Sequence, residues 1–181
     1  YAWLTGDVRA EDRATQYGHR AAIVLFTGSA QTGKTFLARR VEALLVADSR
    51  HAYLLEGENL LQGLDADLSA ADPSFAAERV RRYGEVARLL IDTGLIVVST
   101  SKTFGINYQR MAEMIRTLVQ PAPVIAVHMS RAGEEPPPNT DLHFAGPQDF
   151  DAAARQILEE LKRRGVLIQP SGTKSTIQYS I

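Results

Sequence analysis

The sequence predicts an α/β fold in which about five parallel strands are covered by helices on both faces. Four short apolar runs, rich in β-branched residues, are typical of strands that are buried on both sides. They are residues 21–27, 51–55, 95–100 and 123–128. Segments with apolar residues at helical spacing lie between these runs. Strands that alternate with helices form a parallel sheet between two helical layers.

The remaining elements follow in chain order. Stripes of apolar side chains predict four helices, over residues 34–48, 75–92, 111–118 and 150–161. Residues 141–144 are a candidate fifth strand, and the last residues of the chain alternate in polarity, like an edge strand or a strand lent to a partner. We therefore expect a polar N-terminal arm (1–20), one domain (21–168) and a C-terminal tail (169–181).

The amino-acid composition and net charge indicate which classes of protein this chain can belong to. A chain of 181 residues, 45% hydrophobic and 23% charged, is typical of one globular domain. The net charge of -1 gives no general attraction to nucleic acid or to an anionic membrane. The sequence has no cysteine, and its four histidines lack metal-ligand spacing. No apolar run reaches the ~20 residues of a membrane span and no signal peptide is evident, so we expect a cytoplasmic protein.

The first residue, Tyr1, is not methionine, which leaves open whether the chain is an excerpt of a longer protein.

The segment GSAQTGKT, residues 28–35, joins the first predicted strand to the first predicted helix. Glycines at this spacing let successive backbone N–H groups point at phosphate oxygens, and the helix N-terminus adds partial positive charge. The lysine would reach the β- and γ-phosphates, and the threonine that follows it would hold Mg²⁺. The sequence therefore predicts a P-loop nucleotide-binding fold with a nucleoside triphosphate and Mg²⁺ as ligands. The residues that would bind the triphosphate are Gly28, Ser29, Ala30, Gln31, Thr32, Gly33, Lys34 and Thr35.

Charged side chains follow this loop. Glu56 and Glu58 come directly after the second strand, where open α/β sheets place their ligands. A carboxylate there could hold Mg²⁺ or accept a proton from an attacking hydroxyl; alternatively, the segment is an acidic turn with Glu58 in solvent. Arg81 would bind an anionic substrate or form an i,i+4 pair with Glu85.

Read together, these segments resemble the adenylyl-sulfate (APS) kinase family. The matching pieces are the P-loop, LLEGEN at 54–59 and ERVRRYGEVARLLIDTGLIVV at 78–98, and the resemblance covers roughly residues 3–165. It implies a P-loop kinase that phosphorylates the ribose 3′-hydroxyl of APS with ATP, giving PAPS in sulfate assimilation. It implies that Lys34 and Glu56 are catalytic and that Thr35 and Glu56 hold the metal. The acceptor-binding residues would be Glu58, Asn59, Arg81 and Lys102.

The same resemblance implies partners. APS kinases are commonly homodimers, so we expect a homodimer. Trp3 and the segment GHRAAIVLFTG at 18–28 look like kinase modules that are fused to a sulfate adenylyltransferase (ATP sulfurylase). We therefore expect ATP sulfurylase as a fused domain or a partner, and neither nucleic acid nor a membrane.

Several positions depart from the family pattern, all on the acceptor side. Glu56 and Glu58 stand where the family has aspartates, Leu61 replaces an arginine and Arg79 replaces an asparagine. The segment SKTFGI at 101–106 replaces the one that grips APS.

The lid differs as well. Residues 131–140 form a short, proline-rich, acidic loop in place of the family's long basic lid. We expect an ATP-binding kinase with a degenerate acceptor site and a shortened lid. Two alternatives are a non-catalytic regulatory module associated with ATP sulfurylase and a small-molecule kinase with another acceptor.

Overall fold

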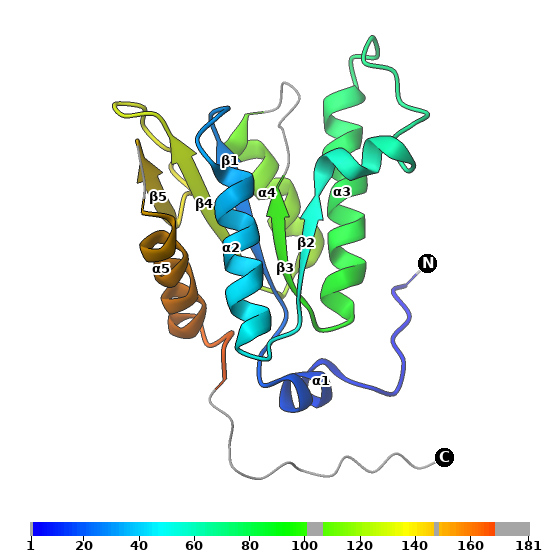
Figure 1. The fold of residues 1–181 in the computed structure, drawn as a ribbon. Coiled ribbons are helices and arrows are strands. Elements are labelled where there is room, and N and C mark those ends of the chain that lie inside the picture. The colour runs from blue at the N-terminus through cyan, green and yellow to red at the C-terminus, as the bar shows by residue number, and fades with distance from the viewer. Residues whose placement is uncertain (1, 101–106, 147–148, 169–181) are drawn as a thin grey trace.

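The computed structural model describes residues 2–100, 107–146 and 149–168. Within these residues, five parallel strands form one sheet in the order β2-β3-β1-β4-β5 (Figure 1). The strands are β1 (Ala22–Gly28), β2 (Ala52–Glu56), β3 (Ile96–Thr100), β4 (Val124–Ser130) and β5 (Leu142–Ala145). The helices are α1 (Ala10–Tyr17), α2 (Lys34–Ala47), the 3-10 helix η1 (Gly57–Gln62), α3 (Phe75–Asp92), α4 (Tyr108–Val119) and α5 (Phe150–Arg163). The predicted α/β fold class is confirmed.

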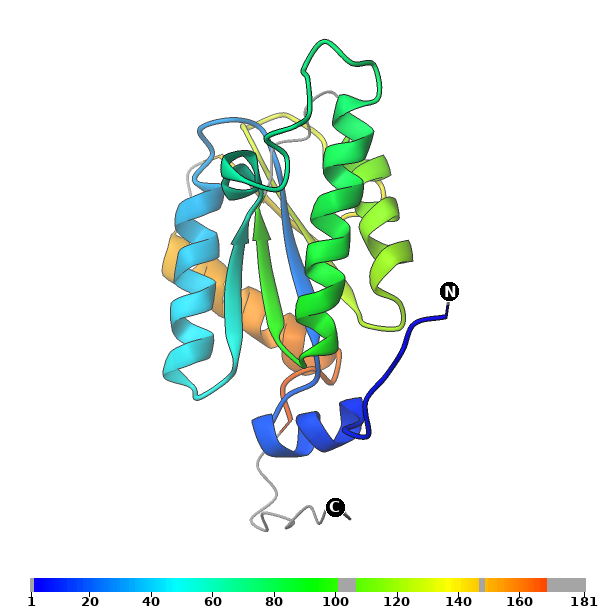
Figure 2. The ribbon, with the colours of Figure 1, turned by 90° about the vertical axis from the view of Figure 1, so that its right-hand side faces the viewer.

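Helices cover both faces of the sheet (Figure 2). Val24 and Phe26 of β1 pack in the core beneath α2 and α5, whereas Ile23 and Leu25 pack in the core beneath α3 and α4. Side chains alternate between the two faces of a strand, so a central strand with helices on both sides must be apolar at nearly every position. This explains why β1 reads as an uninterrupted apolar run.

The carboxyl ends of the parallel strands meet at one edge of the sheet (Figure 1). In register, Phe26 of β1 and Glu56 of β2 both pair with Thr100 of β3. The segments that leave these strands, including the loop after β1 and η1 after β2, therefore start next to one another. Residues far apart in the sequence come together at this edge.

The N-terminal arm, expected only as a polar segment, contains α1. Capping contacts stabilise both ends of this helix. At its N-terminus, the Asp12 carboxylate accepts the backbone N–H of Arg9 at 2.9 Å. Gly18 ends the helix in a left-handed conformation with φ of 68°, and its N–H donates to the Ala14 carbonyl at 2.9 Å. Periodicity did not reveal α1 because Ala14 is its one buried residue.

The arm packs at the end of the sheet opposite the loop after β1 (Figure 1). His19 pairs with Leu167 in an isolated antiparallel bridge. The Tyr17 ring stacks on His51, with ring centroids 4.2 Å apart. Arg50 donates to the Ile168 carbonyl at 3.0 Å and also to that of Gly18. These contacts attach the arm to the domain, in part through Leu167 and Ile168 at the end of the described residues.

Two predicted features lie outside the described residues: Lys102 with its segment 101–106, and the tail 169–181. Among the helices that are described, none has the length and hydropathy needed to cross a membrane.

The buried His19 side chain gives a pH prediction. Its Nε2 accepts the backbone N–H of His51 at 2.9 Å, so Nδ1 carries the proton and faces the Arg20 carbonyl at 3.2 Å. Burial lowers the pKa of His19, and the nearby His51 and Arg50 lower it further, whereas the Arg20 carbonyl acts in the opposite direction. Below the unfolded pKa of about 6.5, the unfolded chain takes up a proton that the folded protein does not. Stability should therefore fall as the pH drops below about 6.5, by up to ~1.4 kcal/mol per pH unit.

Urea unfolding at pH 7.5 and pH 5.5 measures this dependence. We expect His19→Gln to be less stable than the wild type at pH 7.5 and to lose less stability on acidification. Equal losses in the two proteins would show that His19 is not the titrating group.

Candidate functional site

The loop after β1 has a conformation that requires glycine at both ends. Gly28 has φ of 122°, and a Cβ there would lie 1.8 Å from the Met129 carbonyl oxygen. Gly33 has φ of 88°, and a Cβ there would lie 2.6 Å from the Phe150 ring. The Ser29 N–H donates to the Met129 carbonyl at 3.0 Å, which holds the loop against the end of β4. The turn therefore packs closely at both glycines, against the backbone of β4 at Gly28 and against the Phe150 ring at Gly33.

The backbone N–H groups inside the turn are available to a ligand. In the part of the chain that the structure describes, the N–H groups of residues 30–33 have no hydrogen-bond acceptor. The first turn of α2 follows at Lys34, and its partial positive charge adds to theirs. Such an arrangement binds phosphate oxygens.

Lys34 lies close to this turn. Its Nζ donates to the Ser29 carbonyl, which also accepts the Thr32 hydroxyl at 2.9 Å. Burial lowers the pKa of Lys34, and the nearby Glu58 carboxylate opposes that shift. The ammonium group therefore lies against the phosphate loop and is near enough to Glu58 to interact with its charge.

Glu56 ends β2 at the same edge of the sheet. Its Oε2 accepts the Thr100 hydroxyl at 2.5 Å. Within the described residues its Oε1 is buried without a hydrogen-bond partner, and Arg39 Nη2 lies 4.0 Å away. The buried Tyr83 hydroxyl lies 2.8 Å from the Leu55 carbonyl oxygen and so fixes the strand that carries Glu56. One carboxylate oxygen is thus oriented by the protein and the other is left for a ligand.

The residues predicted to hold Mg²⁺ fit such an ion in part. The orphaned Oε1 of Glu56 is a suitable ligand, and Thr35 is exposed in the first turn of α2. No group of three or more His, Asp or Glu side chains in the described residues could hold a metal ion. Mg²⁺ commonly binds one or two protein oxygens together with substrate phosphates, which matches this donor set.

The segment after Glu56 is held from below by a buried ion pair. Arg79 Nε donates to Asp65 at 3.0 Å, and the two side chains are 3% and 1% exposed. Arg79 also donates to the Gly57 carbonyl at 3.1 Å. Glu58 and Asn59 follow Gly57 in η1; Glu58 is half-buried and Asn59 is exposed. The Arg79–Asp65 pair therefore supports the segment that carries Glu58 and Asn59, two of the predicted acceptor-binding residues.

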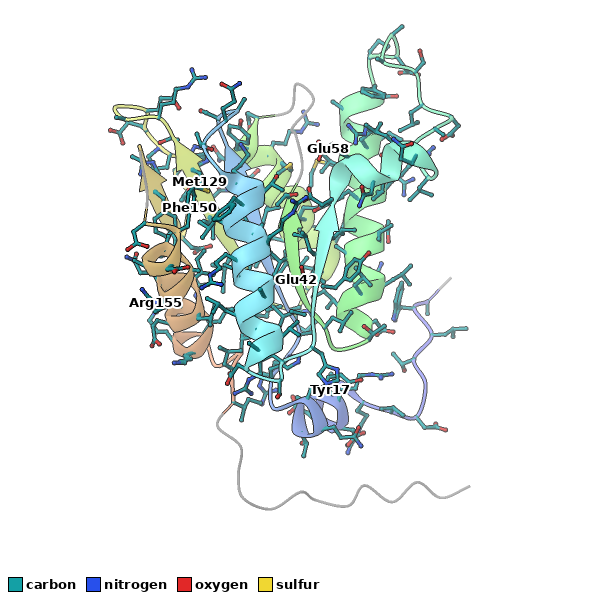
Figure 3. The ribbon with its side chains drawn as sticks, in the orientation of Figure 1. Tyr17, Glu42, Glu58, Met129, Phe150 and Arg155 are labelled. Atoms are coloured by element: carbon teal, nitrogen blue, oxygen red, sulfur yellow. The ribbon has the colours of Figure 1, made fainter. Side chains whose placement is uncertain are left out.

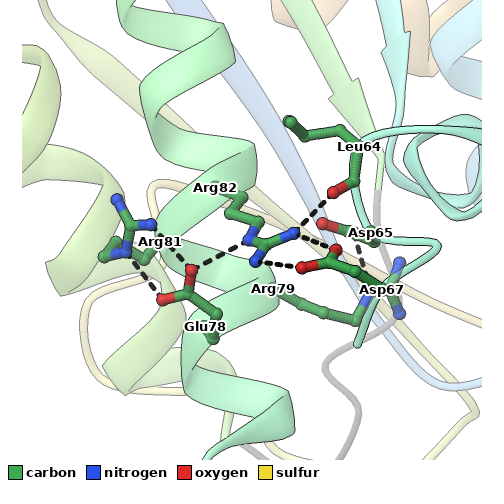
Figure 4. Close-up of polar contacts among 7 residues, drawn as sticks. All are labelled: Leu64, Asp65, Asp67, Glu78, Arg79, Arg81 and Arg82. Atoms are coloured by element: carbon green, nitrogen blue, oxygen red, sulfur yellow. Dashed lines mark hydrogen bonds and ion pairs between the residues drawn. The ribbon is translucent and has the colours of Figure 1, made fainter. Parts of the chain in front are cut away.

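The other arginines of α3 are engaged by carboxylates (Figure 4). Arg81 donates twice to Glu78, at 2.7 Å each, and Arg82 donates to Glu78 at 2.8 Å and to Asp67. These bonds lower the pKa of Glu78 to about 2. The i,i+4 partner considered for Arg81, Glu85, pairs instead with Arg88 at 3.8 Å.

Arg81 also lines a groove of about 900 Å³ between α3 and residues 63–67. No other predicted site residue lines that groove. The structure thus brings the phosphate loop, Glu56 and Glu58 together at the sheet edge and leaves Arg81 on the outer surface of α3.

Sequence reasoning missed the residues that support the loop from beneath. The Tyr108 hydroxyl donates to the Gly28 carbonyl at 2.6 Å, and its ring meets His128 edge-on at 5.1 Å. His128 Nδ1 lies 2.9 Å from the Thr27 hydroxyl, and burial lowers its pKa. Tyr108 and Gly28 are 80 residues apart, so no local pattern could reveal this contact.

The proline-rich loop 131–140 contacts the phosphate loop. The Ser29 hydroxyl donates to Glu134 Oε2 at 2.5 Å, and the Arg131 N–H donates to the same oxygen at 3.1 Å. These hydrogen bonds, the Ser29 bond foremost, lower the pKa of Glu134, so this carboxylate is charged at neutral pH. At the other end of the loop, Asn139 donates to the Gln109 carbonyl of α4 at 3.1 Å. The loop is therefore fastened at both ends beside the phosphate site.

The Glu134 carboxylate should oppose the binding of phosphates because both are negative. We expect Glu134→Gln to bind MgATP several-fold more tightly than the wild type, with a smaller gain at high salt. Glu135→Gln is the matched control, since it removes the same charge from the adjacent exposed residue. Calorimetric titration measures both. Equal affinities for the two variants would contradict a specific role for Glu134.

Comparison with known proteins agrees with this geometry. Residues 20–136 match the family described as Adenylylsulphate kinase. The adenylyl-sulfate kinase of Yersinia pestis is 29% identical over 194 residues, covering 91% of this chain and 89% of that protein. The enzyme of the same name from Shewanella amazonensis is 38% identical over 128 residues, covering 71% of this chain and 63% of that protein.

Solved structures are similar as well. The APS kinase of Mycobacterium tuberculosis, solved as a cysteine-to-alanine mutant, superposes with a TM-score of 0.69 and 29% identity, covering 80% of this chain and 99% of that one. The same kinase in complex with AMPPNP and APS gives a TM-score of 0.67 at 24% identity, with the same coverage. The match over residues 20–136, together with these similarities, shows that this chain belongs to the adenylylsulphate kinase family.

Proposed function

We propose that this protein binds MgATP at the phosphate loop and transfers the γ-phosphoryl group to the 3′-hydroxyl of APS, giving PAPS and ADP. One observation carries the proposal: a preformed turn with available N–H groups lies beside Glu56 and Glu58 at the same edge of the sheet. Family membership supports the choice of acceptor. The related M. tuberculosis kinase has been solved with AMPPNP and APS together.

In this proposal the phosphate loop and Lys34 bind the phosphates, Thr35 is a metal ligand, and Glu56 has two tasks, as a metal ligand and as the base. The N–H groups of residues 30–33 and the Lys34 ammonium bind the β- and γ-phosphates and stabilise the charge that develops during transfer. Thr35 and Glu56 hold Mg²⁺, which supplies charge neutralisation for the phosphates. Glu56, oriented by the Thr100 hydroxyl, accepts the proton of the attacking 3′-hydroxyl.

Fewer groups are in position to bind the acceptor APS than to bind ATP. Glu58 and Asn59 in η1 would bind APS, and Lys102 keeps the role expected from its sequence position. Arg81 would have to exchange its two hydrogen bonds to Glu78 for a substrate anion. Binding of the acceptor by Arg81 would therefore cost these two hydrogen bonds.

A second candidate function is a non-catalytic nucleotide-binding module that regulates an ATP sulfurylase partner. The acidic loop favours it, because Glu134 contacts the phosphate loop and residues 131–140 are fastened at both ends. The family match also ends at residue 136, inside this loop. A short acidic loop would exclude water poorly and would not neutralise the transferring group. A kinase acting on another hydroxyl acceptor is the remaining alternative.

A turnover assay separates these candidates. Purified protein is incubated with MgATP and APS, and ADP and PAPS are quantified by chromatography, with Lys34→Ala as the blank. We expect PAPS and ADP in equal amounts. ATP binding without turnover would favour the regulatory module. ADP release with a panel of other hydroxyl compounds, but not with APS, would favour another acceptor.

We further propose a cytoplasmic homodimer with ATP sulfurylase as its fused domain or partner. Size-exclusion chromatography with light scattering, with and without an ATP sulfurylase, tests both interactions.

A further inference from the structure

Two aromatic side chains lie beside the phosphate loop. Phe36 is in the first turn of α2, two residues after Lys34, and Phe150 is the first residue of α5. Their ring centroids are 4.9 Å apart with an interplanar angle of 55°. We call these two residues the aromatic pair. Figure 3 shows Phe150 directed from α5 toward α2.

The two rings are not equivalent. Phe150 is half-buried and covers Gly33, where an added Cβ would lie 2.6 Å from its ring. Phe36 is 60% exposed, although it is a large apolar side chain. Helix packing between α2 and α5 explains Phe150, but it does not explain why Phe36 leaves most of its surface in solvent.

We propose that the exposed face of Phe36, supported by Phe150, is the stacking surface for the purine base of the bound nucleoside triphosphate. The inference rests on the proposed function, because phosphates in the turn of residues 28–35 are what place the base near α2. Only the ribose separates the base from the α-phosphate, and the aromatic pair adjoins the loop at Gly33. An aromatic ring binds a base through its face, whatever its hydrogen-bonding edge.

Two ligands separate base binding from phosphate binding. Calorimetric titrations are run with MgATP and with magnesium tripolyphosphate, which has the phosphates but no base. We expect Phe36→Ala to weaken MgATP binding by about tenfold, the order that stacking of one base contributes. Its affinity for tripolyphosphate should stay at the wild-type value.

Two further variants guard against a structural explanation. Phe36→Leu keeps an apolar contact with Phe150 but removes the flat ring, so it should lose MgATP affinity while folding normally. Val46→Ala, at the other end of α2 and 54% exposed, should change neither affinity.

The other outcomes overturn the inference in distinguishable ways. Unchanged MgATP affinity in Phe36→Leu and Phe36→Ala would mean that the base lies elsewhere, while the proposed function stands. Equal losses for MgATP and tripolyphosphate would mean that Phe36 shapes the loop instead. A wild-type protein that binds neither ligand would overturn the proposed function and this inference together.

Discussion

Replacing Arg79 with methionine is expected to lower the free energy of unfolding by about 3–5 kcal/mol, since it leaves a buried carboxylate without its cation. Arg79 and Asp65 are almost fully buried, 3.0 Å apart, and Arg79 also binds the Gly57 carbonyl. The pair holds the segment after β2 onto α3. Loss of the guanidinium should therefore destabilise the fold and disorder the part of the site that carries Glu58 and Asn59.

Urea unfolding followed by circular dichroism measures this loss. Arg81→Met is the matched control: it removes an arginine two positions away on α3 whose ion pair is exposed, and should change stability little. In the double variant Arg79→Met with Asp65→Leu, much of the lost stability should return because no buried charge is left alone. A loss below about 1 kcal/mol in Arg79→Met would contradict the structural role of the pair.

Glu56→Gln is expected to lower kcat for PAPS formation by at least about 100-fold, the usual range for removal of a general base. The amide keeps the size of the side chain and its hydrogen bond to Thr100, but it cannot take the proton of the 3′-hydroxyl. The amide still offers an oxygen to Mg²⁺, so the affinity for MgATP should vary only a few-fold. Steady-state kinetics with APS varied at saturating MgATP give the two constants separately.

Glu58→Gln provides the comparison. We place Glu58 on the acceptor side, so this variant should raise the KM for APS more than it lowers kcat. Identical kinetic effects of the two substitutions would contradict the separate roles. An unchanged kcat in Glu56→Gln would transfer the role of base to another group.

The fold could be predicted largely from the sequence. Within the described residues, each predicted strand and helix lies within a few residues of an observed one, because an element covered by the sheet or by helices has to be apolar along its buried face. The phosphate loop could also be predicted, since the positive φ angles at Gly28 and Gly33 favour glycine at both positions. The capping residues Asp12 and Gly18 are sequence signals that would have indicated α1, although this helix has no stripe of apolar residues.

The supports of the site could not be predicted in the same way. The contact between Ser29 and Glu134 joins residues 105 positions apart, and it depends on how β4 lies beside β1. The arginines of α3 look alike in the sequence, yet one is buried on Asp65 and its neighbours bind surface carboxylates. The position of Arg79 in the helical repeat of α3 is enough to predict that its side chain is buried. Its pairing with Asp65 could not be predicted in this way, because Asp65 lies in the irregular segment between η1 and α3.

The most direct test is a calorimetric titration of MgATP into the wild-type protein and into Lys34→Ala. We expect the wild type to bind one MgATP per chain and Lys34→Ala to bind at least about tenfold more weakly, because the ammonium group next to Ser29 would no longer meet the phosphates. Equal affinity in the two proteins, or no saturable binding to the wild type, would contradict the assignment of this loop as the nucleotide site.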